Sequence, residues 1–286
     1  MKYLTKRRIS DTMKQPTTNN QQPTTNNQQP TTNNQQPTTN NQCKICNNMM
    51  IVHDHAIILE KYSVEYYCCC NCGFIQTEEP YWLNEAYSKA ISAMDTGIML
   101  RNLSNANELL FFLQYIRNNK CLDFGGGHGI LTRIMRDYGF NFFHHDKYAE
   151  NLFANGFEGD LTDKYDLITA FENFEHFVKP MEEIEKIINQ TEVLFFSTNI
   201  IPKNNPLIKD WWYFAPGGGQ HISFYTKKSI EYIADKFNLY LVTNNISTHI
   251  LSKKPLNKKI FTQLKIYNKL CKIINMQKIF KKHQKR

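Results

Sequence analysis

The stretch Cys121-Leu122-Asp123-Phe124-Gly125-Gly126-Gly127-His128-Gly129 decides the fold of this chain. Its first four residues predict a short buried strand that runs directly into glycines. Glycine lets the backbone turn sharply and lets a ligand approach the main chain closely. Residues 130–138 follow with a helical apolar face, so the free N–H groups at the start of this helix can meet an anionic group. The stretch therefore predicts a ligand-binding strand–loop–helix unit.

Strands and helices alternate on the C-terminal side of this loop. Apolar runs predict strands at 140–145, 165–171 and 192–197, near Tyr240 and near Ile250, and helical periodicity predicts helices at 181–189 and 229–237. Upstream, residues 78–119 are expected to be mostly helical, with the clearest helix at 107–116. Such alternation favours an α/β fold, with a parallel sheet covered by helices on both faces. Ligands of such sheets bind at the carboxyl ends of the strands.

Three acids accompany the glycine loop. Asp123 begins an Asp-x-Gly-x-Gly-x-Gly spacing, which differs from the Gly-x-Gly-x-x-Gly of dinucleotide sites, although a nicotinamide-dependent oxidoreductase remains the alternative. Asp146 ends the second strand of the unit, where a carboxylate can accept both hydroxyls of a ribose. Asp160 is placed to accept a hydrogen bond from an adenine amino group. For Asp146 and Asp160 the alternative is a capping or turn role.

The loop resembles motif I of class I S-adenosylmethionine-dependent methyltransferases, with Asp123, Gly125, Gly127, Gly129, Asp146 and Asp160 at the cofactor positions. Residues 165–176, Tyr-Asp-Leu-Ile-Thr-Ala-Phe-Glu-Asn-Phe-Glu-His, followed by Pro180, are similar to the fourth-strand motif of a bacterial branch associated with surface-polysaccharide and secondary-metabolite clusters. Residues 81–87 also resemble that branch, and the resemblance covers roughly residues 81–240. It implies a Rossmann-like, doubly wound sheet of seven strands.

The same resemblance implies roles at the end of the fourth-strand motif. Phe171 and Glu172 would lie beside the methionyl part of the cofactor. His176 is either a catalytic group or a residue that holds the strand-to-helix turn by hydrogen bonds.

Residues 211–226 are expected to form the acceptor site, because they follow a strand that ends at the same edge of the sheet. Trp211, Trp212 and Tyr213 offer flat walls for a sugar or ring system, although such aromatic residues could equally belong to the core. His221 is the preferred general base for a hydroxyl acceptor, since imidazole titrates near neutral pH; a structural hydrogen bond is the alternative.

The segment after Gln220 resembles the Glu-His-x-x-Tyr-Phe segment of sugar C-methyltransferases, with glutamine in place of the glutamate. This resemblance implies a sugar, nucleotide-sugar or surface-glycan acceptor that is methylated on oxygen or carbon.

Two Cys-x-x-Cys pairs, separated by 22 residues, predict a small zinc ribbon at residues 43–77. Four thiolates would leave no open coordination position, so the zinc is expected to be structural. A non-catalytic zinc-dependent binding protein is the alternative, but this segment has few basic residues with which to bind nucleic acid. The predicted ligands are Cys43, Cys46, Cys69 and Cys72.

The remaining segments complete the predicted organisation. Residues 1–42 contain four copies of Gln-Pro-Thr-Thr-Asn-Asn-Gln and are expected to be disordered, because they offer nothing apolar to bury. The methyltransferase domain is expected at residues 78–251. Residues 252–286 carry twelve Lys or Arg and no acid, which predicts a basic helix that packs on its own domain or contacts an anionic membrane.

The charge and hydropathy of the sequence limit which partners and which cellular compartment are expected. The net charge of +8 resides in that C-terminal segment, and the rest of the chain has a net charge of −4, so no nucleic-acid partner is expected. The sequence has no run of 18 apolar residues and no secretory signal, and we expect a cytoplasmic protein.

Overall fold

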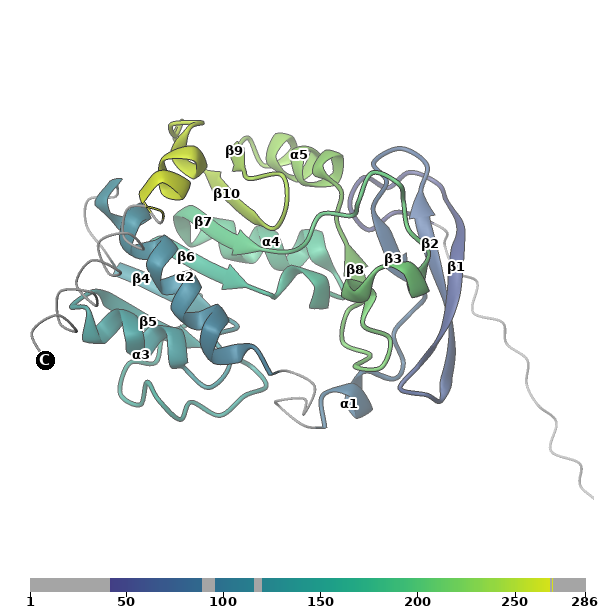
Figure 1. The fold of residues 1–286 in the computed structure, drawn as a ribbon, viewed down its shortest axis with the longest axis horizontal. Helices are drawn as coiled ribbons and strands as arrows, with labels where there is room; N and C mark the ends of the chain where they lie inside the picture. The colour runs from purple at the N-terminus through teal and green to yellow at the C-terminus, as the bar shows by residue number, and fades with distance from the viewer. Residues whose placement is uncertain (1–41, 89–95, 116–119, 268, 270–286) are drawn as a thin grey trace, which may run out of the picture. The chain divides into compact units, whose positions relative to one another are not determined.

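A mixed six-stranded sheet forms the centre of the fold, in the order β5-β4-β6-β7-β10-β9 (Figure 1). The first four strands of this order run parallel, and β10 runs antiparallel to both of its neighbours. Their bounds are β4 Lys120–Phe124, β5 Asn141–His145, β6 Tyr165–Phe171, β7 Thr191–Ser197, β9 Tyr240–Thr243 and β10 Thr248–Ser252. The central strands are mostly apolar, and most of their residues are buried, because both faces of the sheet are covered.

The protein is described by a computed structural model that covers residues 42–88, 96–115, 120–267 and 269. The repeats of the N-terminal segment lie outside the described residues, apart from Gln42, as do residue 268 and residues 270–286 of the basic segment. Residues 260–267 are helical and pack on the sheet through Ile260, Phe261 and Leu264. No helix in the described part is both long and apolar enough to cross a membrane.

Helices cover both faces of the sheet, as a doubly wound fold requires. One face buries Ala106 and Leu109 from α2 together with Leu131 and Met135 from α3. The other face buries side chains of α4 and α5, including Ile184 and Ile230 respectively. The helices are α1 Leu83–Ala86, α2 Ile98–Phe112, α3 Ile130–Asp137, α4 Pro180–Asn189 and α5 Lys227–Lys236, with short 3-10 turns η1 Leu113–Tyr115, η2 Phe174–His176, η3 Ile208–Asp210 and η4 Trp212–Phe214.

The described residues give the main sheet six strands, so the predicted count of seven is not confirmed. Beyond β5, the described residues form only an isolated parallel bridge, between His144 and Glu158. His144 N donates to Phe157 O at 2.7 Å, and Gly159 N donates to His144 O at 2.9 Å. A parallel crossover usually contains a helix, and the residues between His145 and Glu158 form none, so pairing stops after one bridge.

A second sheet contains the cysteine segment, in the antiparallel order β1-β2-β3-β8. Its strands are β1 Met50–Ile58, β2 Tyr62–Cys69, β3 Ile75–Thr77 and β8 Ser223–Phe224. The fourth strand thus comes from the predicted acceptor region, far along the chain, and Figure 1 shows it beside β3. The cysteine segment and the acceptor region also share a core that includes Tyr66, Trp82, Tyr213, Phe214 and Phe224.

Candidate active site

The glycine loop needs glycine at three positions because its backbone turns through left-handed conformations. Gly125, Gly127 and Gly129 have φ values of +64°, +57° and +84°, and Gly129 directly precedes α3. Asn173 closes over the first of them, since a Cβ added at Gly125 would lie 1.7 Å from Asn173 Oδ1. The Asn173 side chain donates to Phe124 O at 3.2 Å, which ties the loop to the end of β6.

Asp123 lies beneath this loop and is 2% exposed. Its carboxylate accepts hydrogen bonds from Thr169 Oγ1 at 2.8 Å and from Thr132 Oγ1 at 3.4 Å. Burial raises the pKa of Asp123 to about 7, against these two hydrogen bonds. Asp123 therefore joins β4, β6 and α3 below the loop, which fixes the glycine turn.

Asp146 stands at the end of β5 and binds the glycine loop directly. Its Oδ2 accepts from Gly127 N at 2.9 Å, and its Oδ1 accepts from the N–H groups of Tyr148 and Ala149, both at 2.7 Å. The carboxylate thus has the turn role that the sequence left as the alternative. Each carboxylate oxygen can accept more than one hydrogen bond, so the predicted ribose contact is compatible with this arrangement.

Asp160 is exposed and is held in a turn. It accepts hydrogen bonds from the hydroxyl and the N–H of Thr162, which lower the pKa of its carboxyl. The predicted adenine contact stays a prediction, and the observed contacts are those of a turn residue.

Glu172 follows β6 in a left-handed conformation with φ +54°. Ser197 at the end of β7 holds it twice: its hydroxyl donates to Glu172 Oε1 at 2.6 Å and accepts from Glu172 N at 2.8 Å. This conformation costs a non-glycine residue roughly 1 kcal/mol, which the paired hydrogen bonds offset. Phe171 is half-buried, and its ring packs on Phe195 at 5.5 Å.

Two histidines meet above the carboxyl ends of β6 and β7. The rings of His176 and His221 lie perpendicular with centroids 5.0 Å apart. His221 Nδ1 lies 2.6 Å from Tyr213 O, and because a carbonyl only accepts, Nδ1 carries the proton and Nε2 offers a lone pair. His176 Nδ1 lies 3.0 Å from the Tyr87 hydroxyl.

Burial keeps both imidazoles neutral. It lowers the pKa of His176 to about 3, with a further contribution from His221, and it lowers the pKa of His221 below its ordinary value. The available Nε2 lone pair of neutral His221 is what a general base requires, whereas His176 is engaged by the Tyr87 hydroxyl and by the backbone of Gln220. The structure thus brings the two predicted catalytic candidates together in the same protonation state.

Glu175 lies next to this pair and is fully buried. Neither of its carboxylate oxygens has a hydrogen-bond partner among the described residues. Burial, together with the negative charge of Glu172, raises the pKa of the Glu175 carboxyl well above its ordinary value. Ligand atoms of Glu175, His176 and His221 lie within 4.8 Å of one another.

Tyr87 is a site residue to which the sequence assigned no role. Its ring stacks on Tyr148 at 4.8 Å, while its hydroxyl reaches His176. It therefore joins the turn after Asp146 to the histidine pair. The only sequence signal was its place in residues 81–87, which resemble the same family branch.

The three predicted aromatic walls have different surroundings. Trp212 is 77% exposed, Trp211 is half-buried, and Tyr213 is fully buried. Tyr213 therefore belongs to the core, as the alternative held, with its hydroxyl 3.3 Å from Thr198 Oγ1. Trp212 remains available for a flat ligand.

The four predicted metal ligands converge. The Sγ–Sγ distances are 3.6 Å for Cys43 and Cys72, 3.4 Å for Cys46 and Cys69, and 3.5 Å for Cys46 and Cys72. Tetrahedral zinc with Zn–S bonds of about 2.3 Å places its sulfurs about 3.8 Å apart, so small side-chain shifts would accommodate the ion. Backbone N–H groups of Ile45 and Cys72 point at the sulfurs of Cys43 and Cys69, both at 3.4 Å. This donor set fits zinc.

Comparison with known protein families agrees with the cofactor-binding role predicted for the glycine loop. The model of a family described as a methyltransferase domain matches residues 99–244, which is just over half of the chain. No curated protein matches the chain in sequence.

Solved methyltransferase structures are similar to parts of the chain at low identity. One is the magnesium protoporphyrin IX methyltransferase of Synechocystis with bound S-adenosylhomocysteine (13% identity, 60% of this chain, 94% of that chain, TM-score 0.38). Another is the human N-acetylserotonin methyltransferase with S-adenosylmethionine (14%, 53%, 51%, TM-score 0.40). A third is an O-methyltransferase family 2 protein of Planctomyces limnophilus with apigenin (14%, 59%, 66%, TM-score 0.37). The chain spans less than two thirds of the length of the last two, and similarity at this level does not bear on the acceptor.

The family match does not support the alternatives of a nicotinamide-dependent oxidoreductase or a non-catalytic zinc protein. It coincides with the segment that holds the glycine loop, Asp146 and His221. The chain therefore belongs to the methyltransferase-domain family, which confirms the prediction of an S-adenosylmethionine-dependent methyltransferase.

Proposed function

We propose that this protein transfers the methyl group of S-adenosylmethionine to a hydroxyl or carbon of a sugar, nucleotide-sugar or surface glycan. The observation that carries the proposal is the pair His176 and His221, which stands at the same sheet edge as the glycine loop. The half-buried Trp211 and the exposed Trp212 lie in the same loop as His221 and offer flat surfaces for a sugar ring.

The chemistry needs little beyond placement and proton removal. The cofactor supplies the electrophilic methyl group, and the protein aligns the acceptor with it and excludes water. We assign His221 as the general base that takes the acceptor proton on Nε2, and His176, held by Tyr87, as the second candidate. The cofactor residues are Asp123, Gly125, Gly127, Gly129, Asp146, Asp160, Phe171 and Glu172.

The test is formation of S-adenosylhomocysteine from S-adenosylmethionine, with nucleotide-sugars, simple glycosides and phenols offered as separate acceptor panels. Turnover with a nucleotide-sugar or glycoside, and a new methyl group located on the sugar by NMR, would support the proposal. Turnover with the phenols alone would contradict the sugar assignment and leave methyl transfer intact.

We also propose that Cys43, Cys46, Cys69 and Cys72 hold a structural zinc ion, which the converging thiols and their N–H donors support. Elemental analysis of the purified chain tests this: one zinc per chain is expected. A chain that folds with less than about a tenth of a zinc per molecule would contradict it.

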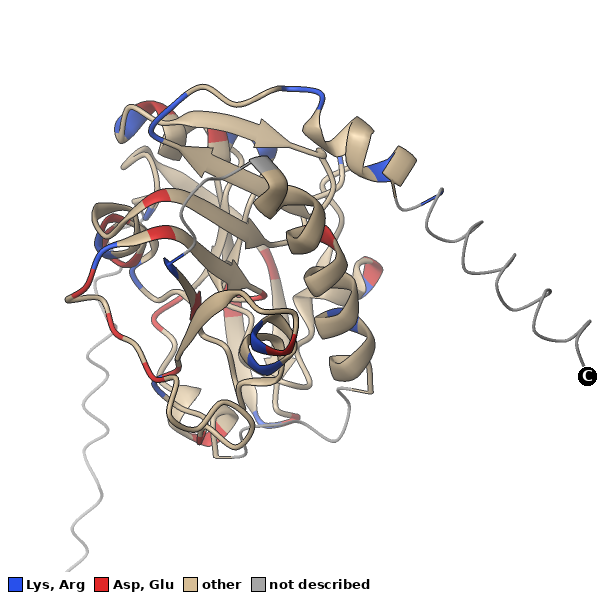
Figure 2. Cartoon of the chain, turned by 90° about the vertical axis from the view of Figure 1, so that its left-hand side faces the viewer, with Lys and Arg blue, Asp and Glu red and all other residues tan. Residues whose placement is uncertain are grey.

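Two further expectations concern macromolecular partners at the protein surface, namely nucleic acid and membranes. Figure 2 shows acidic and basic residues interspersed over the described part in that view, which fits the proposal that the chain does not bind nucleic acid. We keep peripheral contact of the basic C-terminal segment with an anionic membrane, and cytoplasmic localisation, as proposals. Vesicle sedimentation with and without residues 270–286 would test the first.

A further inference from the structure

The sheet of the cysteine segment is completed by the strand that follows His221. In β8, Ser223 and Phe224 pair with Gln76 and Ile75 of β3 (Figure 1). The side chain of Ser223 also donates to Phe177 O at 2.8 Å, just after η2. The position of β3 thus sets the position of the backbone two residues beyond His221.

The backbone of Ile222, next to His221, is held from two sides. Its N–H donates to Glu175 O at 2.8 Å, and its carbonyl accepts from Thr77 N at 3.1 Å. One partner belongs to the turn that carries His176, and the other belongs to β3. The distance between the two histidine rings therefore depends on the strand that the cysteine segment supplies.

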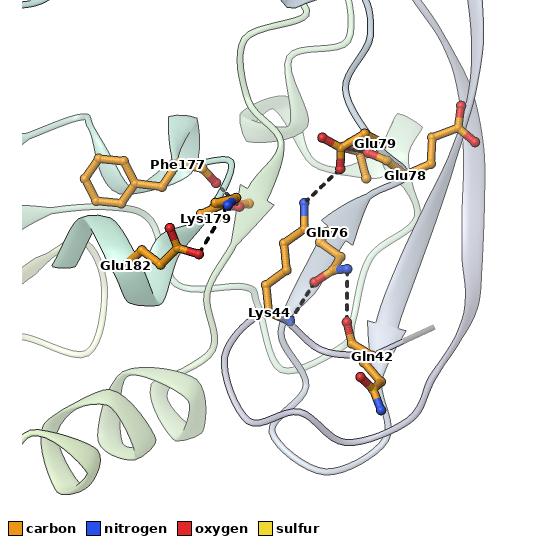
Figure 3. A network of polar contacts seen from close by, with 10 residues as sticks. Gln42, Lys44, Gln76, Glu78, Glu79, Phe177, Lys179 and Glu182 are labelled. Atoms are coloured by element: carbon orange, nitrogen blue, oxygen red, sulfur yellow. Dashed lines mark hydrogen bonds and ion pairs between the residues drawn. The ribbon is translucent and has the colours of Figure 1, made fainter. Parts of the chain in front are cut away.

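The first Cys-x-x-Cys loop is joined to β3 through Gln76 (Figure 3). The Gln76 side chain, 7% exposed, accepts from Lys44 N at 3.0 Å and donates to Gln42 O at 3.4 Å. Lys44 stands between the ligands Cys43 and Cys46. A change in the position of this loop would therefore be transmitted to Gln76, the residue that pairs with Ser223.

The second Cys-x-x-Cys loop is joined to the start of α5. Cys72 O accepts from Thr226 Oγ1 at 2.5 Å, and Asn71 O accepts from Lys228 Nζ at 2.6 Å. Thr226 is also the N-cap of α5, where its hydroxyl accepts from Ser229 N. The loop around the second ligand pair thus fixes the far end of the segment that begins at His221.

The rest of the acceptor loop is held by β1 and its neighbours. A bulge in β1 directs His53 and Asp54 at this loop: His53 Nε2 lies 3.0 Å from Pro206 O, and Asp54 Oδ2 accepts from Ile208 N at 2.8 Å. Trp82 Nε1 donates to Gly219 O at 2.8 Å.

The glycine loop has different supports. Its hydrogen bonds come from the main sheet and its edges, such as Gly126 N to His145 O at 3.2 Å and Gly127 N to Asp146 Oδ2 at 2.9 Å. Asn173 holds Phe124 from the end of β6. Among the described residues, the hydrogen bonds of the cysteine segment therefore reach the acceptor half of the site and not the glycine loop.

We propose that the cysteine cluster positions the acceptor half of the active site: with its metal bound, it holds β3 against β8 and so places His221 and the loop of residues 206–219, while the cofactor half binds its ligand without it. The proposal rests on the zinc occupancy proposed above and not on the identity of the acceptor.

Cys69→Ser removes one ligand, and Cys70→Ser is its matched control, because Cys70 is the exposed neighbour outside the cluster. Both full-length variants, and the native chain with and without a zinc chelator, are compared by amide hydrogen exchange and by calorimetric titration with S-adenosylhomocysteine. Cys69→Ser and chelation are expected to speed exchange at residues 206–226 by at least about tenfold. Affinity for S-adenosylhomocysteine should stay within about threefold of the native value, and Cys70→Ser should change neither quantity.

NMR titration of the histidine side chains measures whether His221 keeps its buried position. The pKa of His221 is lowered by burial, and it is expected to move up towards about 6.5 when the metal is removed. The pKa of His249, which burial in the main sheet lowers to about 4, should not move.

Two results would overturn the proposal. One is unchanged exchange at residues 206–226 after the metal has been lost, and the other is a loss of S-adenosylhomocysteine binding in parallel with the loss of loop protection. If Cys69→Ser does not fold, Asp54→Ala keeps all four cysteines and removes the side-chain acceptor for Ile208 N, together with the local hydrogen bond from His55 N. It should speed exchange at residues 206–214 at unchanged metal content, and no change there would count against the proposal. Failure of the native chain to bind S-adenosylhomocysteine would instead defeat the proposed function.

Discussion

His221 combines an anchored Nδ1, a lowered pKa and a place beside His176, and these three features support its assignment as the base. His221→Gln keeps the approximate size of the side chain and removes the proton acceptor. We expect the rate of methyl transfer to fall by about 10²- to 10⁴-fold. Affinity for S-adenosylhomocysteine should stay within about threefold, because the cofactor loop is supported elsewhere.

The direction of the His221 pKa shift also predicts a pH profile. A base whose pKa in the free enzyme lies below about 6.5 is mostly unprotonated above that pH, so the acid limb of kcat/KM should lie below pH 6.5. Steady-state rates from pH 5 to 8 check this. A half-maximal rate above pH 7 would argue against His221 as the base.

Gly125 and Gly127 form a matched pair, because both have positive φ but only the first is covered. Alanine at either position is strained by roughly 1–2 kcal/mol. At Gly125 the new Cβ would also collide with the Asn173 side chain. Urea unfolding should therefore show a larger loss of unfolding free energy for Gly125→Ala than for Gly127→Ala. Adding Asn173→Ala to the Gly125→Ala variant should recover part of the difference. Equal losses would mean that Asn173 moves aside without cost.

His249 is a buried histidine outside the proposed site, and it predicts a pH dependence of stability. Its Nε2 lies 3.0 Å from Thr198 O and its Nδ1 lies 2.7 Å from Thr243 Oγ1, while burial lowers its pKa to about 4. The unfolded chain, with a pKa near 6.5, binds this proton first, so the contribution is present above pH 6.5 and is lost as pH falls towards 4.

His249→Gln cannot titrate and isolates this effect from the other ionisable groups. The native chain should lose about 2 kcal/mol relative to the variant between pH 6.5 and 4.5. Urea unfolding at both pH values measures the difference, and parallel pH curves for the two chains would refute it.

At the scale of elements, β8 is the shortest strand among the described residues, but it joins the segment that carries His221 to the sheet of the cysteine segment. Two residues cannot be recognised as a strand from periodicity, because alternation needs about four residues to be seen. The strand exists because β3 offers an unpaired edge and because Phe224 is buried against Tyr66 and Phe214. The tertiary contact therefore decides the element.

Thr226 lies between β8 and α5 and is the N-cap of α5, where it forms a capping box with Ser229. Thr226→Ala removes the cap and the hydrogen bond to Cys72 O, which should cost about 1–2 kcal/mol. Differential scanning calorimetry should show a Tm lower by a few degrees, roughly 2–8 °C. Thr226→Ser keeps the hydroxyl and is expected to lie close to the native value; an equally low Tm for both variants would mean that the methyl group, and not the hydroxyl, is responsible.

At the scale of the whole molecule, ligand binding to the cofactor half should stabilise the fold. S-adenosylhomocysteine at about 100 times its Kd should add about 2.7 kcal/mol and raise the Tm by several degrees. NAD at the same concentration should leave the Tm unchanged. A Tm raised by NAD and not by S-adenosylhomocysteine would reverse the assignment of the cofactor.

The sequence alone determined much of this protein, because the deciding signals are local. The glycine spacing, the strand–helix alternation and the paired Cys-x-x-Cys motifs each lie within neighbouring residues, and they predicted the α/β class, the glycine turn and the convergence of four thiols. Only the tertiary structure decided that β8 completes the sheet of the cysteine segment, that Tyr87 meets His176, and that pairing beyond β5 stops after one bridge. These features join residues far apart in the chain, and they depend on which side chains can be buried together, a choice that no local pattern encodes.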